Sequence, residues 1–184
     1  YISEIKDYTN IILSEVEKLE HLMDGILSIS GSVSVCIEPE NLNDFIRKEV
    51  KSIHFDGDVE LNLDEHLERV RVCFDERLIS IALRDILKIV TDSPSNRIMI
   101  RTKIKPKSRS FSVFISSNGV RIAPTILPDI FDTFMTTNTD RTGISLANAK
   151  AIIEAHGGSI SIRNNTDLTF EISLPIIASP VPNC

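Results

Sequence analysis

Three charged residues share one face of a predicted helix and could do chemistry together. Asp85, Lys88 and Asp92 follow one another at spacings of three and four residues, which brings side chains together on a helix surface. Carboxylate oxygens are ligands for a hard cation, and an ammonium group between two carboxylates can form ion pairs. The simplest interpretation is a stripe of ion pairs facing solvent, and the alternative is that these groups line a binding site.

Two short segments combine turn residues with the start or end of a predicted element. Residues 117–121 (Ser-Asn-Gly-Val-Arg) follow a strand pattern, and residues 141–145 (Arg-Thr-Gly-Ile-Ser) precede a helix pattern. Backbone amides at a helix N-terminus can hold a phosphate, and the Ser145 hydroxyl can cap the helix. That helix therefore forms whether or not phosphate binds.

The apolar periodicity predicts the elements that position these residues. Alternating patterns indicate strands, and patterns with helical spacing indicate helices. Strands are expected at 33–37, 59–63, 69–73, 98–104, 111–116, 159–163 and 169–174, and helices at 41–53, 75–90, 126–131 and 146–156. His156, at the end of the last helix, is expected to satisfy helix carbonyls rather than act as a catalyst. The sequence predicts an α+β fold, a two-layer sandwich of mostly antiparallel strands with helices on one face.

The N-terminal segment carries a heptad seam, typical of a coiled coil or a four-helix bundle. Apolar residues recur in steps of three and four, interrupted only by Thr9, and we expect them to form a homodimer interface: Ile5, Ile12, Val16, Leu19, Met23 and Ile26. Further apolar residues widen the stripe beyond a two-stranded coil, which favours a bundle. The alternative is that this helix packs on its own domain.

Composition excludes several classes of function. The net charge of −6 argues against a nucleic-acid partner, since such binding needs an excess of Lys and Arg. No apolar run approaches the ~20 residues of a membrane span, so we expect no membrane contact and a cytoplasmic location. The three cysteines, Cys36, Cys73 and Cys184, have no metal-ligand spacing, and buried free thiols are expected for the two within apolar runs.

Two stretches resemble the nucleotide-binding core of bacterial sensor histidine kinases, which have the GHKL (Bergerat) ATPase fold. They are residues 114–134, ending in Ile130-Phe131-Asp132-Thr133-Phe134, and residues 141–158, ending in His156-Gly157-Gly158. The resemblance implies that residues 1–30 are the second helix of a dimerisation and phosphoacceptor hairpin, whose histidine-bearing partner helix is expected to be absent. It further implies a GHKL domain at 31–177, with a flexible tail at 178–184.

The resemblance implies a nucleotide site of the family's kind. In that site an asparagine holds magnesium, an aspartate accepts a hydrogen bond from the adenine amine, and glycines surround the phosphates. Here Lys88 or Ile89 takes the place of that asparagine, depending on the register, and Ser117 takes the place of the aspartate. Lys88 could then occupy the metal position, paired with Asp85 and Asp92. The remaining nucleotide-binding positions that the resemblance implies are Gly119, Arg121, Thr142, Gly143 and Ser145; only Gly119 and Gly143 keep a family glycine.

The resemblance leaves three functions open. The first is a degenerate, kinase-like two-component protein that binds ATP poorly and acts through dimerisation, partner binding or histidine phosphotransfer. The second is an active ATP-dependent histidine kinase with a rewired pocket, with ATP and Mg²⁺ as cofactors and a response regulator or partner kinase as partner. The third is a non-catalytic adaptor. No catalytic residue and no metal site are expected within this sequence, and no cofactor under the first and third functions.

Overall fold

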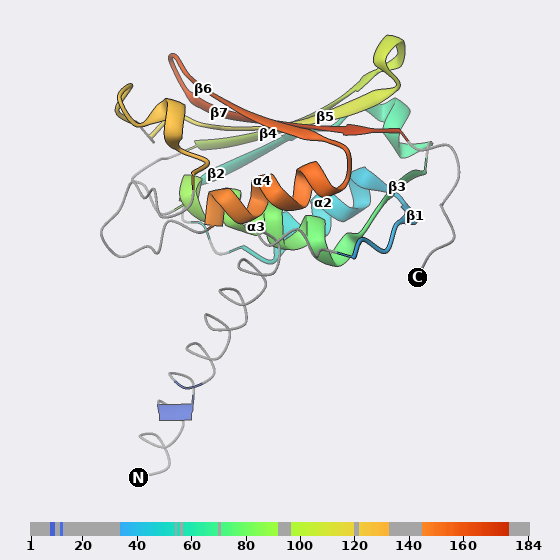
Figure 1. The fold of residues 1–184 in the computed structure, drawn as a ribbon, viewed down its shortest axis with the longest axis horizontal. Coiled ribbons are helices and arrows are strands. Elements are labelled where there is room, and N and C mark those ends of the chain that lie inside the picture. Colours follow the sequence, from blue (N-terminus) through green and yellow to red (C-terminus); the bar gives the residue numbers. More distant parts are fainter. Residues whose placement is uncertain are drawn as a thin grey trace.

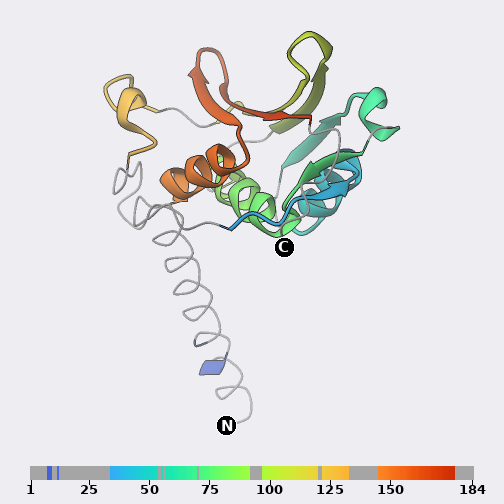
Figure 2. The same cartoon turned by 45° about the vertical axis from the view of Figure 1, so that its right-hand side comes forward.

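The chain forms a two-layer sandwich, seen in a computed structural model that describes residues 8, 9, 12, 34–53, 55, 57–69, 71–91, 97–119, 122–132 and 145–176. One layer is a five-stranded sheet, and the other contains the helices, which cover one face of that sheet (Figure 1). The opposite face of the sheet carries no helix among the described elements (Figure 2). The predicted α+β two-layer fold is confirmed.

The first layer is a sheet of five described strands. They are β2 (Asp58–Asn62), β4 (Arg97–Lys105), β5 (Ser110–Ser117), β6 (Ser159–Asn164) and β7 (Leu168–Pro175), in the order β2-β4-β5-β7-β6. β2 and β4 are parallel, and the other neighbours are antiparallel. Ile100 lies opposite Ile115, which lies opposite Phe170, and all three are buried. We call the face to which these three point the covered face, and the other the open face.

Three helices complete the second layer. α2 (Leu42–Lys51) begins at Asn41, whose side chain accepts a hydrogen bond from the Asp44 amide at 3.1 Å. α3 (Glu76–Thr91) begins at Asp75, whose carboxylate accepts one from the Leu78 amide at 3.0 Å. α4 (Ser145–Ala155) packs beside α3 under the sheet (Figure 1). Side-chain caps of this kind satisfy amides that a helix start leaves unpaired.

A close approach of backbones ends α4. Gly157 has a φ of +70°, and a Cβ placed on Gly158 would lie 2.5 Å from the Ser173 carbonyl oxygen of β7. Only glycine fits there without displacing the strand, because real Cβ atoms do not come that near to backbone. The predicted glycine stop after His156 therefore also sets how tightly α4 lies against the sheet.

One predicted strand is wrong. Residues 34–37 have no regular structure, and the strand is β1 (Glu38–Glu40), which pairs antiparallel with β3 (Val72–Phe74). The amide of Cys36 donates to the Asp75 carboxylate at 3.0 Å instead of to a neighbouring strand. Two short 3₁₀ turns follow β2 and β4, namely η1 (Glu65–Glu68) and η2 (Pro106–Ser108), and the helix predicted at 126–131 is a third, η3 (Leu127–Asp129).

The cysteine prediction is confirmed at one position and wrong at another. Cys73 is a buried free thiol in β3. Cys36 is disulfide-bonded, with a partner that lies outside the described residues. The side chain of Cys36 is only half-buried, outside any strand, so the apolar run around it does not enclose the sulfur.

The N-terminal seam lies mostly outside the described residues. Of its predicted members only Ile12 is described, and its side chain is 62% exposed; Ile5, Val16, Leu19, Met23 and Ile26 are not described. The dimer interface stays a prediction, as do the domain bounds and the flexible tail at 178–184. Within the described part of the chain, no helix is long and apolar enough to cross a membrane.

Candidate functional site

Several elements end at one side of the sandwich. The C-terminal end of α3, the N-terminal end of α4, the last residues of β5 and the η3 turn lie together there (Figures 1 and 2). The side-chain amide of Asn164, at the end of β6, donates to the Ile122 carbonyl at 2.5 Å. This bond ties the segment after β5 to the far edge of the sheet. The predicted site residues that the structure describes come from these elements.

The charged face of α3 is only partly a solvent-facing stripe. Asp85 is buried, with 6% of its surface exposed, whereas Lys88 is exposed. Asp92 lies outside the described residues. The interpretation of a solvated stripe is therefore wrong for Asp85.

Burial also favours one of the two sequence registers. Ile89 is half-buried against the core, four residues after Asp85, whereas Lys88 points to solvent. Residues four apart share a helix face, so Ile89 lies on the same side of α3 as Asp85. The metal-holding asparagine of the family corresponds to Ile89 in this register, and an isoleucine side chain offers no oxygen to a cation.

Ser117 is the last residue of β5 and points toward the helices. Its side chain lies on the covered face, as do those of Val113 and Ile115, and it is 1% exposed. Its Oγ has no hydrogen-bond partner among the described residues. A buried hydroxyl without a partner is costly and is expected where a ligand or water completes it. The next residue, Asn118, accepts a hydrogen bond from the Arg97 amide at 3.2 Å, which fixes the end of β5 to the start of β4.

The other predicted positions are divided. Gly119 is half-buried just after β5, and Ser145 is half-buried at the first residue of α4. Arg121, Thr142 and Gly143 lie outside the described residues. All of the nucleotide-binding positions remain predictions.

The sequence reasoning missed Asn148. It lies one turn into α4, is buried, and its Oδ1 has no hydrogen-bond partner among the described residues. The sequence indicated its burial only through its spacing of four residues from Ile152, which places both side chains on the core-facing side of the helix. A second buried polar atom without a partner, on the helix that begins at the site, supports a ligand pocket at this end of the sandwich.

His156 links the two central helices and does not belong to the site. Its Nδ1 lies 2.7 Å from the Ile152 carbonyl, as the predicted role at the helix end requires, and its Nε2 accepts a hydrogen bond from the Asp75 amide at 3.1 Å. Burial lowers the pKa of His156, against smaller opposite effects of the Ile152 carbonyl and the Asp75 carboxylate. The neutral ring joins the end of α4 to the start of α3.

The described residues fit part of a nucleotide. Ser117 can accept one hydrogen bond from an amine, and the apolar side chains of Ile122, Ile130 and Phe131 pack at the same end of the core. The described residues contain no group of three or more His, Cys, Asp or Glu side chains placed to hold a metal.

Comparisons with known proteins identify the fold. Residues 74–177 match the family described as "Histidine kinase-, DNA gyrase B-, and HSP90-like ATPase". The sensor histidine kinase ZraS of Salmonella typhimurium is 27% identical over 183 residues, which cover 95% of this chain but 39% of ZraS. The chain thus spans well under half the length of that curated relative.

Solved structures agree with this match. The histidine kinase AdeS of Acinetobacter baumannii superposes with a TM-score of 0.75 at 22% identity, covering 94% of this chain and 83% of that one. The histidine kinase ThkA, in complex with the response regulator protein TrrA, gives 0.67 at 25% identity, covering 94% and 52%. The chain belongs to the histidine kinase-, DNA gyrase B- and HSP90-like ATPase family, and it corresponds to the C-terminal catalytic region of a sensor histidine kinase.

Proposed function

We propose that this chain is the kinase-like part of a two-component signalling protein whose pocket does not support ATP-dependent autophosphorylation. In this proposal residues 1–30 form a dimerising helix, and residues 31–177 form a GHKL domain that acts through partner binding or histidine phosphotransfer. A cytoplasmic location follows from the same proposal. The relatives support its signalling part, and the residues at the pocket support its catalytic part.

The observation that carries the proposal is the side of α3 that faces the pocket. Ile89, one of the two positions that the resemblance pairs with the family's metal-holding asparagine, is half-buried there, and Lys88 is exposed to solvent. A magnesium ion needs oxygen ligands in near-octahedral geometry, and an isoleucine removes one that protein would supply. Magnesium, when bound in this family, neutralises phosphate charge. Without it, the phosphates of ATP would meet a chain with a net charge of −6.

The second supporting observation is Ser117. Its buried hydroxyl can accept one hydrogen bond but carries no charge. Hydrogen bonds to an ionised acceptor are about twice as strong as neutral ones. A pocket with Ser117 in place of an aspartate should therefore bind adenine weakly and with less selectivity.

Titration calorimetry of the full chain with ATP, with and without Mg²⁺, tests this. We expect no saturable binding below about 1 mM and no gain from Mg²⁺. The double variant Ile89→Asn/Ser117→Asp should restore the family residues and tighten binding at least about tenfold, with a dependence on Mg²⁺. The matched control Ile81→Asn/Ser116→Asp makes the same exchanges on α3 and β5 away from the pocket and should not bind. Micromolar, magnesium-dependent binding by the unchanged chain would contradict the proposal.

The partner is proposed from the relatives. ThkA is solved with the response regulator protein TrrA, and we propose a response regulator or a partner kinase as the binding partner of this chain. Sedimentation of the chain and of Ile12→Asp/Leu19→Asp tests the dimer. The double variant should be monomeric, because two charges in an apolar seam destabilise the association; a dimer that persists would exclude this seam.

A second candidate function rests on two buried polar groups. The Asp85 carboxylate lies on the Ile89 side of α3, and Asn148 lies buried on α4 with an unpartnered amide oxygen. Together they could hold a cation in a rewired pocket of an active kinase. Autophosphorylation of a chain extended by a phosphoacceptor helix separates the candidates. Radiolabel transfer that is lost in Asp85→Ala but kept in Asp129→Ala, a change at an exposed carboxylate, would favour the active kinase.

A further inference from the structure

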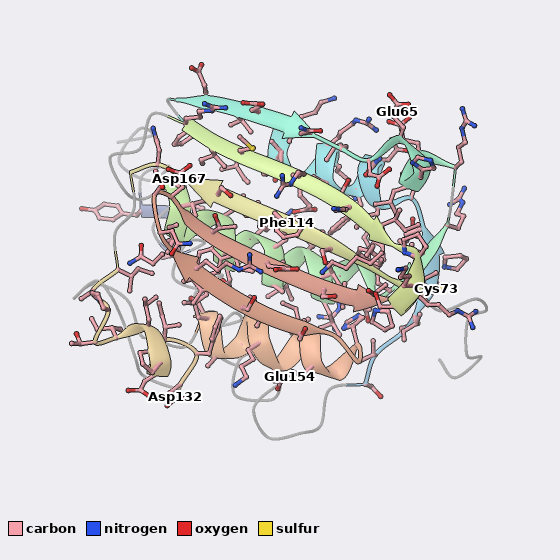
Figure 3. All side chains as sticks on the ribbon, turned by 90° about the horizontal axis from the view of Figure 1, so that it is seen from above. Glu65, Cys73, Phe114, Asp132, Glu154 and Asp167 are labelled. Carbon is pink, nitrogen blue, oxygen red and sulfur yellow. The ribbon has the colours of Figure 1, made fainter. Side chains whose placement is uncertain are left out.

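The open face of the sheet carries a shallow cavity that lies apart from the candidate site. Its volume is about 600 Å³, and its lining extends across the sheet from β2 to β6, with Phe114 near the centre (Figure 3). The charged groups around it are Arg101, Lys103, Lys105, Arg163, Asp64 and Glu171. Four cations against two carboxylates give a local excess of positive charge in a chain whose net charge is −6.

The two carboxylates are already satisfied within the protein. Glu171, 13% exposed, accepts hydrogen bonds from Lys105 and Arg163, each at 2.8 Å. Asp64 accepts from the Ile104 and His66 amides at 3.1 and 3.0 Å, which holds it to the backbone beside η1. Neither acid forms an ion pair with the remaining cations of the cavity among the described residues.

The remaining cations are Arg101 and Lys103. Neither forms an ion pair among the described residues, and both are exposed. The Arg101 guanidinium lies over the Phe114 ring, 4.8 Å from its centroid. This contact keeps the guanidinium beside the ring, and a guanidinium can bind a carboxylate through two parallel hydrogen bonds.

The spacing of these cations matches an extended peptide. Arg101 and Lys103 are two residues apart on β4 and point to the same face, so their Cα atoms lie about 6.6–6.8 Å apart. Alternate side chains of any extended segment repeat at this same distance. We propose that the open face is a docking surface for an extended acidic segment of a partner protein, with carboxylates at alternate positions that pair with Arg101 and Lys103.

The rest of the open face fits a peptide better than a nucleic acid. The neighbouring side chains on β5 and β7 are hydroxyls, and Ser116 and Thr169 already bond to each other at 2.9 Å. Phe114 is the one aromatic residue on this face of the described strands. Proteins that bind single-stranded nucleic acid stack successive bases on several aromatic rings, which this face does not provide.

Fluorescence anisotropy of the full chain with labelled peptides at low ionic strength tests the proposal. The probe is a peptide in which glutamate alternates with threonine, and its reference is a peptide of the same composition with the glutamates in one block. We expect the alternating peptide to bind more tightly, and its binding to weaken at least about tenfold in Arg101→Glu/Lys103→Glu. The matched control Arg77→Glu/Lys107→Glu makes the same change of net charge at exposed residues outside the cavity and should stay within about twofold.

Each other result overturns the proposal. Equal binding of the two peptides would show that spacing plays no part, and equal losses in the two double variants would show an unspecific charge effect. Tighter binding of a single-stranded oligonucleotide at the same face would assign a different class of partner.

The variant Phe114→Leu provides a second test. It keeps the charges but removes the ring under Arg101, and binding should weaken about threefold. Thermal unfolding of each variant accompanies the titrations. This inference does not depend on the pocket, so calorimetry with ATP and these titrations can fail independently.

Discussion

The two faces of the five-stranded sheet are built from the same strands under opposite constraints. On the covered face, Ile100, Ile115 and Phe170 are fully buried beneath the helices. On the open face, their neighbours along the chain, such as Arg101, Phe114 and Glu171, form ion pairs and a stacked cation in contact with solvent. Alternation along a strand separates the two sets, because successive side chains point to opposite faces.

The residues that indicate function differ between the two faces. Between the covered face and the helices almost every side chain is apolar, so a buried polar group such as Ser117 of β5 or Asn148 of α4 is an exception that requires a reason. On the open face polar groups are ordinary, and the exceptions are an aromatic ring and two cations without acid partners. The docking surface is inferred from such exceptions, whereas the candidate site comes from the family resemblance and is supported by them.

The largest expected effect compares two phenylalanines across the sheet. Phe170→Ala removes a fully buried ring from the covered face and should lower the free energy of unfolding by about 3–5 kcal/mol. Phe114→Ala removes a half-buried ring that contacts Arg101, and should cost about 1 kcal/mol. Urea denaturation of both variants measures the difference. Equal losses of stability would mean that the Phe114 ring is packed as closely as the Phe170 ring, which would contradict the difference between the two faces.

The covered face was the part of the fold that the sequence predicted well. Strands β4, β5 and β7 and helices α3 and α4 follow strong apolar periods, and burial against a second layer is what creates those periods. The strand predicted at 33–37 failed because its alternation reflected partial burial in a loop. There the Cys36 amide bonds to the Asp75 carboxylate, a contact between residues 39 positions apart that no local pattern records.

The site was predicted less completely than the fold. The resemblance to the kinase family selected Ser117 and Ile89, but only burial separated Ile89 from Lys88. Asn148 was missed because one polar residue in an Ala-rich helix resembles a surface position. The docking surface was not predicted either, since its members come from β4, β5, β6 and β7 and meet only through the strand register.

The second prediction tests the link between α3 and α4 beneath the covered face. Because burial lowers the pKa of His156 below its usual 6.5, the unfolded chain binds the proton more tightly than the folded one. The stability that the neutral ring contributes is therefore present above pH 6.5 and is lost as the pH falls from there through the lowered pKa. His156→Gln should cost about 1–3 kcal/mol at neutral pH, since it disturbs two buried hydrogen bonds.

The pH profile separates this from a simple packing defect. Denaturation across pH 5 to 8, about the range in which histidine titrates, should show a smaller loss on acidification in His156→Gln than in the unchanged chain. His66→Gln removes an exposed histidine outside this link and is the control, which should leave the free energy of unfolding at neutral pH within about 0.5 kcal/mol of that of the unchanged chain. A profile unchanged by His156→Gln would mean that another group causes the acid sensitivity.

A smaller effect, of opposite sign, is expected at the pocket. Ser117→Ala removes a buried hydroxyl that has no partner among the described residues, and should raise the free energy of unfolding by about 1 kcal/mol. Ser112→Ala is the matched change on the open face of the same strand. The Ser112 hydroxyl donates to Glu171 at 3.4 Å, so its loss should be destabilising by about 0.5 kcal/mol. If Ser117→Ala destabilised the chain more than Ser112→Ala, its hydroxyl would have a structural partner and would be a poor candidate for ligand contact.

A small effect on stability is also expected at Glu171, and it says most about the open face. Its hydrogen bond to Lys105, then the charges of Lys105 and Arg163, lower the pKa of Glu171 against the effect of burial. A carboxyl with a lowered pKa stabilises the fold above its unfolded pKa of about 4.5, and this contribution is lost as the pH falls through the lowered value. Because the Arg163 side chain is 64% exposed and solvent screens the pair, Glu171→Gln should cost less than about 1 kcal/mol, and still less at high salt.

The same substitution should have the opposite effect on binding. Glu171→Gln removes the acid that neutralises Lys105 and Arg163, so the cavity gains two available cations while the fold hardly changes. The alternating acidic peptide should then bind more tightly, by about threefold to tenfold, and with a steeper dependence on salt. Glu154→Gln, at an exposed residue of α4 in the other layer, changes the net charge equally and should leave peptide binding as it was. Tighter binding in both variants would reflect the overall charge of the protein, whereas tighter binding in Glu171→Gln alone would place the peptide on the open face, beside the carboxylate that competes with it.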